Sequence, residues 1–268
     1  MIEPQRAGPG IISERIGRLE SHDRPTSNLD VPRSALAVGA HPDDIEIGCG
    51  ATFAKWAAAG CSIHHLVLTD GSKGTWDRTE DSASLVARRQ TEQSEAARRL
   101  GGGEVVFLGR PDGELRNSIR EQWELCRHIR QLRPEVVLGH DPWRPYRLHP
   151  DHRNAGFLLT DSVVAARDPL YFADQELEAW RPRTLLLFEA GEIDHIEDVT
   201  GFEDTKVDAL LAHESQYETT FSIDHPGRAL RVRDPQAAPL CEAVRRHLTH
   251  EGRPAGFHSA EGFHRLEV

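Results

Sequence analysis

The chain has 268 residues, of which 38% are hydrophobic and 28% charged, a balance typical of a folded globular protein rather than a disordered one. The mean hydropathy is −0.53, and no run approaches the roughly 18 consecutive apolar residues of a membrane-spanning helix. A formal net charge of −11 argues against a general nucleic-acid or anionic-membrane binder. The first twenty residues lack the apolar segment of a secretory signal, so we expect a cytoplasmic protein.

From residue 34 onward, short apolar runs alternate with segments of helical periodicity. The run 35–40 is apolar and bounded by turn-forming residues, which is typical of a strand buried on both faces. A helix is expected from about residue 45 until Gly60. Further strands are predicted at 63–69, 105–108, 136–139 and 185–188, and further helices at 85–100, 119–132, 155–166 and 207–213.

Strands that alternate with helices favour right-handed βαβ units. We therefore predict an α/β fold, a Rossmann-like three-layer sandwich with a mostly parallel central sheet. Residues 1–33, rich in proline and charge, are expected to form an N-terminal arm with one short helix around 12–19. Residues 34–221 are expected to form the α/β domain, and residues 222–268 a C-terminal extension that packs on the same domain.

The cysteines of this sequence show no spacing typical of disulfides or of a metal site. The four cysteines are scattered and form no C-x-x-C pair: Cys49, Cys61, Cys126 and Cys241. A disulfide framework and a thiolate zinc site are therefore both disfavoured.

A turn rich in ionisable groups follows the first predicted strand and reads His41-Pro42-Asp43-Asp44. Ligands of open α/β sheets bind at the carboxyl ends of the strands, where loops lead into helices. Since His41 and Asp44 are three positions apart, such a turn can aim an imidazole and a carboxylate at one point, with Asp43 beside them. Alternatively, one of the two aspartates caps the helix and His41 is a polar loop residue. This segment alone leaves both interpretations open.

A second segment of this kind reads His149-Pro150-Asp151-His152-Arg153 and again lies between a predicted strand and a predicted helix. If the helix begins here, His152 lies on its apolar face and His149 lies in the preceding loop. A histidine on an apolar helix face is more often a core residue than a ligand. The second segment by itself is therefore also ambiguous.

Together the two segments predict a metal site. A catalytic zinc ion takes three protein ligands and leaves one position open for water, and His41, Asp44 and His152 supply such a set. A carboxylate, Asp43, and an imidazole, His149, then remain. Amide hydrolysis requires a base for the attacking water and a donor for the developing oxyanion. We therefore favour a divalent-metal site over a purely structural role for these residues.

Five short segments resemble the LmbE-like, or PIG-L, N-acetylglucosaminyl deacetylase family. They are AHPDD at 40–44, TDG at 69–71, HPDHR at 149–153, AHESQ at 212–216 and AEGF at 260–263. The resemblance covers about residues 35–216 and the C-terminus, and it excludes the N-terminal arm.

The resemblance implies roles for individual residues. The residues that match the family's zinc ligands are His41, Asp44 and His152; another divalent metal such as Fe²⁺ is an alternative. Asp43 matches the general base, and His149 matches the histidine that stabilises the tetrahedral intermediate. Asp151 is expected to orient the His149 imidazole.

The resemblance implies substrate-contacting residues less specifically than it implies the metal ligands and the base. Arg89 fits an R-x-x-E pattern of a substrate-contacting arginine, and Asp112 fits an aspartate in a later strand-end loop. Some family members have a tyrosine two residues before the first histidine of HPDH. This chain has Arg147 there and Tyr146 next to it, which puts a tyrosine role in doubt.

Two further histidine segments are assigned structural roles. Charge clusters usually lie at the surface, so a solvated loop or strand edge is favoured over a second metal site for Asp194, His195, Glu197 and Asp198. His140 and Asp141 also follow a strand and are interpreted as an ordinary loop.

The function expected from these observations is a zinc-dependent hydrolase that removes an N-acetyl group from a glucosamine-type sugar or sugar conjugate. The substrate class comes from the resemblance. An amidase that cleaves a larger amide conjugate and a non-catalytic sugar-binding protein of the same fold are the alternatives. The expected partner is a small N-acylated sugar, with no nucleic acid and no membrane, and a homo-oligomer is left open.

Overall fold

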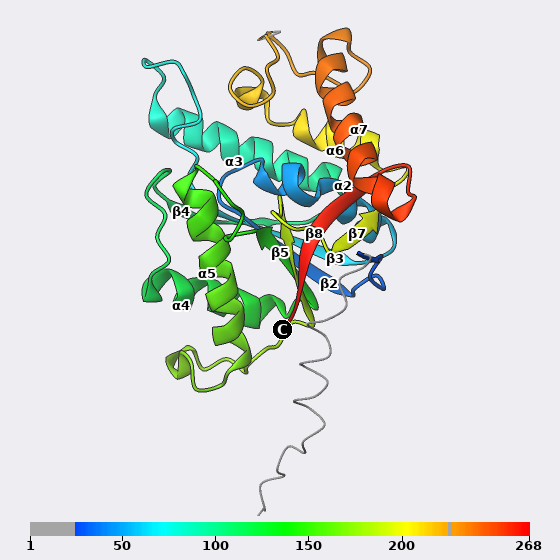
Figure 1. Cartoon of the computed structure of the whole chain (residues 1–268). Coiled ribbons are helices and arrows are strands. Elements are labelled where there is room, and N and C mark those ends of the chain that lie inside the picture. Colours follow the sequence, from blue (N-terminus) through cyan, green and yellow to red (C-terminus); the bar gives the residue numbers. More distant parts are fainter. Residues whose placement is uncertain (1–24, 225–226) are drawn as a thin grey trace, which may run out of the picture.

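The computed structural model describes residues 25–224 and 227–268, which form one eight-stranded sheet covered by helices on both sides (Figure 1). The predicted Rossmann-like three-layer fold with a mostly parallel sheet is confirmed. The short helix predicted around 12–19 lies outside the described residues.

The strands and helices that the sequence periodicity predicts are present, with differences at some boundaries. The structure adds three strands, at 26–27, 195–198 and 260–267, and a helix at 238–252 that the sequence periodicity did not predict. The strands are β1 (Thr26–Ser27), β2 (Ser34–Gly39), β3 (Ser62–Thr69), β4 (Val105–Arg110), β5 (Val136–His140), β6 (Thr184–Phe188), β7 (His195–Asp198) and β8 (Ala260–Glu267). The helices are α2 (Asp44–Ala58), α3 (Ser82–Arg99), α4 (Ile119–Leu132), α5 (Pro150–Arg167), α6 (Glu203–Leu210) and α7 (Ala238–Gly252).

The boundary differences of helices α5 and α6 concern segments next to the predicted site residues. Helix α5 begins at Pro150 rather than at residue 155, because proline is favourable in the first turn of a helix, where its missing N–H is not needed. Helix α6 spans Glu203–Leu210 instead of 207–213, and a separate 3₁₀ turn, Glu214–Gln216, follows it. The first difference places His152 inside the helix.

The sheet separates two apolar cores. Helices α2, α3, α6 and α7 lie on one side of it, and α4 and α5 lie on the other (Figure 1). Because successive side chains of a strand point to opposite faces, Ala35 and Ala37 of β2 pack in the core beside α2, whereas Leu36 and Val38 pack in the core beside α4 and α5. This explains the nearly continuous apolar run of β2.

The order of the strands locates a crevice. The order is β1-β7-β8-β6-β5-β2-β3-β4, and β2 pairs in parallel with both β3 and β5. From β2 the chain first continues to β3 and β4 on one side, and later to β5 and β6 on the other. Loops at the carboxyl ends of β2 and β5 therefore diverge, which is where ligands bind in open α/β sheets.

The sequence predicts that the cluster around β7, residues 194–198, is solvated. This prediction is wrong for His195 and Glu197, which are buried. Both side chains of β7 have no exposed surface, and His195 Nε2 lies 2.8 Å from Glu197 Oε1. Lys55 Nζ donates to Glu197 Oε2 at 2.5 Å, and Thr26 Oγ1 lies 2.8 Å from His195 Nδ1. The cause is β1, which pairs in parallel with β7 and covers its edge.

The C-terminal strand β8 completes helix α2. Cys49 interrupts α2 with non-helical torsion angles, φ −150° and ψ 21°. Glu261 of β8 accepts hydrogen bonds from the backbone N–H groups of Ala51 and Thr52, at 3.1 and 2.7 Å, just after the interruption. Lys206 Nζ donates to the same carboxylate at 2.6 Å. A side chain near the end of the sequence thus caps the second half of α2.

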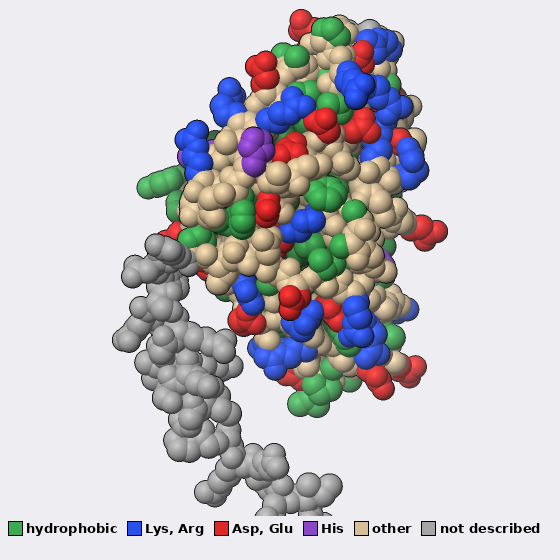
Figure 2. Space-filling model, turned by 90° about the vertical axis from the view of Figure 1, so that its right-hand side faces the viewer, with side chains coloured by type: hydrophobic (Ala, Val, Ile, Leu, Met, Phe, Trp, Pro, Cys, Tyr) green, Lys and Arg blue, Asp and Glu red, His purple; other side chains and the backbone are tan. Residues whose placement is uncertain are grey.

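The surface toward α7 and β7 carries intermixed positive and negative side chains (Figure 2). Such a mixture does not produce the extended positive field by which nucleic-acid binders attract phosphates. Among the described residues, no helix combines the length and apolar character that crossing a membrane requires.

Stability should decrease in mild acid because of His65. This β3 side chain is fully buried, its ring nitrogens have no hydrogen-bond partner, and burial lowers its pKa from 6.5 to about 4. Between these pH values the unfolded chain binds a proton that the folded chain does not, so unfolding becomes easier by roughly 3 kcal/mol as pH falls from 6.5 to 4. Urea unfolding of His65→Leu, in chelator, should lose most of this pH dependence.

The exposed His258 provides the control, because His258→Leu should keep the pH dependence of the wild type. An unchanged slope of unfolding free energy against pH in His65→Leu would assign the acid sensitivity to other groups.

Candidate active site

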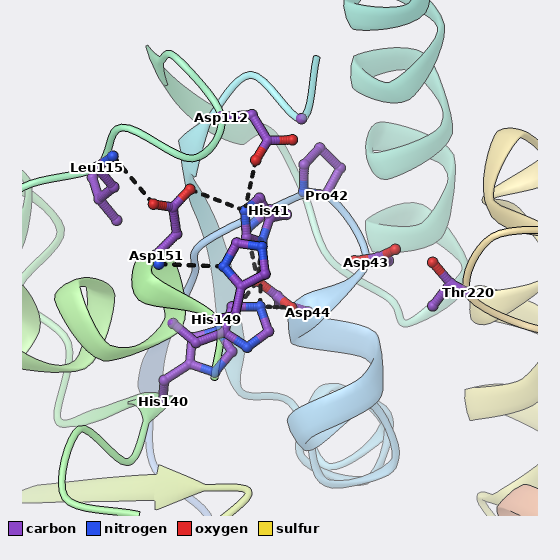
Figure 3. Close-up of polar contacts among 12 residues, drawn as sticks. His41, Pro42, Asp43, Asp44, Asp112, Leu115, His140, His149, Asp151 and Thr220 are labelled. Carbon is purple, nitrogen blue, oxygen red and sulfur yellow. Dashed lines mark hydrogen bonds and ion pairs between the residues drawn. The ribbon is translucent and has the colours of Figure 1, made fainter. Parts of the chain in front are cut away.

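Three side chains converge at the carboxyl ends of β2 and β5 (Figure 3). His41 follows β2, Asp44 begins α2, and His152 lies in the first turn of α5. His152 Nε2 lies 3.3 Å from His41 Nδ1 and 3.3 Å from Asp44 Oδ1, and His41 Nδ1 lies 3.4 Å from Asp44 Oδ2. Residues 111 positions apart in the sequence therefore meet at one point.

The spacing of these atoms fits a tetrahedral metal ion. Zinc binds imidazole nitrogen and carboxylate oxygen at about 2.0–2.1 Å, so two ligands of a tetrahedral ion lie about 3.3 Å apart. The measured separations of 3.3 and 3.4 Å match this value. His41, Asp44 and His152 thus could hold a divalent cation.

His140 stands directly behind Asp44, which the interpretation as an ordinary loop did not anticipate. It ends β5, is 1% exposed, and its Nε2 lies 3.1 Å from Asp44 Oδ2. A carboxylate oxygen can only accept a hydrogen bond, so Nε2 of His140 carries the hydrogen. His140 therefore orients the Asp44 carboxylate from the side opposite the cavity.

Arg147 and Glu189 surround the other nitrogen of His140. Arg147 Nη1 lies 3.0 Å from His140 Nδ1, 3.2 Å from His152 Nδ1 and 2.9 Å from Glu189 Oε2. Burial alone would raise the pKa of Glu189, but the hydrogen bond to His140 and the charges of His140 and Arg147 lower it to about 2. Arg147 therefore lies behind the His41-Asp44-His152 cluster, where its contacts help to hold His140, His152 and Glu189 in place.

Two carboxylates contact the outer nitrogen of His41. Asp151 Oδ2 and Asp112 Oδ1 each lie 3.2 Å from His41 Nε2. Asp151 also accepts hydrogen bonds from the backbone of Gly113 and Leu115, at 2.6 and 3.2 Å. The predicted arrangement differs here, because the Asp151 carboxylate orients His41 and only the backbone N–H of Asp151 contacts His149.

Asp43 lies beside the cluster, between it and Thr220 (Figure 3). Its backbone adopts a left-handed conformation, φ 102°, and donates to Gln93 Oε1 at 2.9 Å. The side chain is not a helix cap, since it makes no capping hydrogen bond. Burial raises the pKa of Asp43 to about 6, although the nearby Arg89 guanidinium opposes this shift. A carboxylate with a raised pKa is suited to proton transfer near neutral pH.

Arg89 is nearly inaccessible, with 3% of its surface exposed, although sequence similarity implied a substrate contact. Its guanidinium donates to the carbonyl oxygens of Pro42 and Gly71, at 2.6 and 2.9 Å, and lies 3.4 Å from Asp43 Oδ2. A Cβ atom at Gly74 would lie 2.2 Å from Arg89 Nη1, so a larger residue there would displace the guanidinium from these contacts. Arg89 mainly holds the turns after β2 and β3 together.

His149 is exposed at the mouth of the site and caps α5. Its Nδ1 accepts a hydrogen bond from the backbone N–H of Asp151 at 3.2 Å. The neutral ring therefore carries its hydrogen on Nε2, where it is available to a ligand. Partial burial lowers the pKa of His149, and the neighbouring His41 and His152 lower it further. The ring centroid lies 4.7 Å from that of His41.

A cavity of about 440 Å³, within the range of small-molecule sites, is lined by seven of these residues: His41, Asp43, Asp44, Arg89, Asp112, His149 and His152. Sequence reasoning did not assign Gln216 and Thr220 to it, although Gln216 belongs to the recognised AHESQ segment. Gln216 Nε2 donates to the Gly74 carbonyl at 3.0 Å, and Glu92 accepts from the Ser215 hydroxyl at 2.6 Å. These two contacts attach the segment to the β3–α3 loop and to α3.

A Rossmann-like sheet with a His-Asp-His cluster and a buried aspartate at its switch point defines the class: α/β proteins with a candidate metal site. Residues 36–163 match the family described as PIG-L, GlcNAc-PI de-N-acetylase. The chain belongs to this PIG-L, or LmbE-like, family.

The proteins to which this chain is similar do not all catalyse the same reaction. The chain is 34% identical over 188 residues to a diacetylchitobiose deacetylase of Thermococcus kodakarensis, covering 69% of this chain and 70% of the relative. It is 27% identical to a 4-oxalmesaconate hydratase of Pseudomonas putida, covering 78% and 86%. The N,N'-diacetylchitobiose deacetylase of Pyrococcus horikoshii, solved with an inhibitor, superimposes with a TM-score of 0.79 at 26% identity, covering 99% and 95%.

Measurements of metal affinity should distinguish residues that bind the ion directly from residues that only orient them. If His41, Asp44 and His152 hold the ion, His152→Ala removes one of its three protein ligands and should lose most of the zinc that the wild type binds. His140→Leu removes only the contact behind Asp44 and should weaken zinc binding about 10- to 100-fold. Competition with a chromogenic chelator measures both. Equal losses in the two variants would place His140 among the ligands, and full zinc content in His152→Ala would remove His152 from them.

Proposed function

We propose that this protein is a zinc-dependent hydrolase that removes an N-acetyl group from a glucosamine-type sugar or sugar conjugate. The observation that carries the proposal is the convergence of His41, Asp44 and His152 at tetrahedral spacing with Asp43 beside them. Family membership and similarity to two diacetylchitobiose deacetylases support the reaction and the substrate class.

A zinc ion, or another divalent cation such as Fe²⁺, held by His41, Asp44 and His152 would supply Lewis acidity and make a bound water more acidic. Asp43 accepts the proton of the attacking water at its carboxylate and returns it to the leaving nitrogen. Its burial and raised pKa suit both transfers, because the carboxylate is neither strongly solvated nor permanently charged. Arg89 and Gln93 hold Asp43 in place.

His149 donates a hydrogen bond to the carbonyl oxygen as negative charge develops there. Since Nδ1 is occupied by the Asp151 backbone N–H, the donor is Nε2–H, and the neutral ring is sufficient. Asp112 and Asp151 fix the His41 ring from behind and keep its inner nitrogen aimed at Asp44 and His152.

The alternatives predict different products. An amidase for larger conjugates would release a larger acid than acetate, and a sugar-binding protein would release neither. A binding protein has no use for a buried carboxylate such as Asp43, which disfavours this alternative. The relationship to a hydratase shows that the fold is compatible with other reactions, so the product must be identified directly.

The decisive experiment incubates protein of known metal content with N-acetylated mono- and disaccharides and longer-chain N-acyl analogues. Acetate and free amine should form in equal amounts, and removal of the metal by a chelator should stop the reaction. Release of only longer acids would favour the amidase, and binding without release would favour the sugar-binding protein.

Asp43→Asn tests the base. Asparagine keeps the size and polarity of the side chain but cannot accept the water proton, so turnover should fall about 10²- to 10⁴-fold. Zinc content should stay at the wild-type level, because Asp43 is not among the three donors. Rates of acetate release and metal analysis of the same sample measure both. Near-normal turnover would assign the base to another residue.

His149→Ala tests the oxyanion donor. Turnover should fall by about 10²-fold, as for other donors of this kind, with zinc retained. His149→Gln, which can still present an N–H group, should recover part of the loss. If zinc content falls together with activity, His149 is a metal ligand instead; if neither changes, it is an ordinary loop residue.

A further inference from the structure

A second cavity of about 420 Å³ adjoins the site cavity and lies between α2, α6, α7 and β8. We call it the α7 pocket, and its apolar wall consists of Ile47, Leu210, Phe221, Leu240 and Val244. Building on the proposed function, we propose that the α7 pocket binds a second ring of the substrate, attached to the N-acetylated sugar. This ring is uncharged or carries an amine, and it is not anionic.

The two cavities share part of their lining. Ile47 and Thr220 contribute to both. Ile47 lies in the first turn of α2, three residues after Asp44, and Thr220 lies beside Asp43 in Figure 3. A substrate with its amide at the His-Asp-His cluster therefore reaches the α7 pocket past Asp43. Each cavity is within the size range of a small-molecule site, so together they exceed what a single sugar needs.

The charges around the α7 pocket exclude an anionic occupant. Lys206 is 3% exposed, and its ammonium donates to Glu261 and to the Ile47 carbonyl, so it is not available to a ligand. Two of the three carboxyl groups of the lining already face cations, because Glu261 contacts Lys206 and Glu189 contacts Arg144 and Arg147. The third, Glu251, contacts His247 at 3.3 Å. The cations of the lining are therefore occupied, and a phosphate or carboxylate group in the pocket would find no free positive partner among them.

The remaining polar capacity fits hydroxyl or amine donors. Glu251 accepts one backbone hydrogen bond, from Gly262 at 2.7 Å, and its other oxygen lies 3.3 Å from His247 Nε2. A carboxylate offers about four acceptor positions, so Glu251 can accept further hydrogen bonds. The apolar wall suits the C–H face of a sugar ring, with Phe221 as its aromatic member.

Filling the α7 pocket tests the proposal. Val244→Trp adds bulk on the pocket side of α7, so kcat/KM for N,N'-diacetylchitobiose relative to N-acetylglucosamine should fall at least tenfold. Arg246→Trp, at an exposed position of the same helix outside the lining, should leave this ratio unchanged. A parallel loss for both sugars in Val244→Trp, or no change in the ratio, would overturn the proposal.

A binding measurement separates this inference from the proposed function. The Kd of the de-N-acetylated disaccharide, measured by calorimetry, should weaken at least tenfold in Val244→Trp and in Glu251→Gln. Weaker binding in both variants would support the pocket assignment even if the wild type releases no acetate. Lack of acetate release would contradict only the proposed deacetylase function. Equal Kd values in wild type and both variants would reject the pocket assignment. A selective loss for N-hexanoylglucosamine would also reject it, because the pocket would then bind the acyl group.

Discussion

The parallel pairing of β2 with β5 is the constraint on which the site depends. It places the ends of two strands, about one hundred residues apart in sequence, side by side, and the helices that follow them diverge. The β2–α2 turn supplies His41 and Asp44, and the β5–α5 loop and the start of α5 supply His149 and His152. Any change that moves one strand relative to the other would separate these donor atoms, because neither segment holds a complete set.

The site is kept in place by buried charge rather than by apolar packing. Asp44, which faces His41 and His152, is supported from behind by His140, and His140 by Arg147 and Glu189. Removing one member leaves a buried charge or donor unpaired, which costs more than the net stabilisation of the intact pair. If the cluster holds a metal ion as proposed, its affinity for that ion should therefore depend on His140, Arg147 and Glu189 as well as on the three residues that face the ion.

Sequence reasoning predicted the alternation of strands and helices and brought the two histidine-aspartate segments together, because both follow buried strands and strand ends share one edge of the sheet. It could not predict contacts that depend on the strand order. His140 was interpreted as an ordinary loop residue although it faces Asp44, and His195 was placed at the surface although β1 covers it. Short, polar segments such as β1 and β7 carry little periodicity, so their pairing leaves no pattern in the sequence.

The interruption of α2 has a consequence for synthesis on the ribosome. The N–H groups of Ala51 and Thr52 find their acceptor in Glu261, 210 and 209 residues later. The second half of α2 therefore lacks its cap until Glu261 has been synthesised and has left the exit tunnel. A nascent chain can form the central parallel strands β2, β3 and β5 earlier, but it completes helix α2 only when β8 is available. Premature termination before β8 should then yield a protein that retains these strands and has a less stable α2.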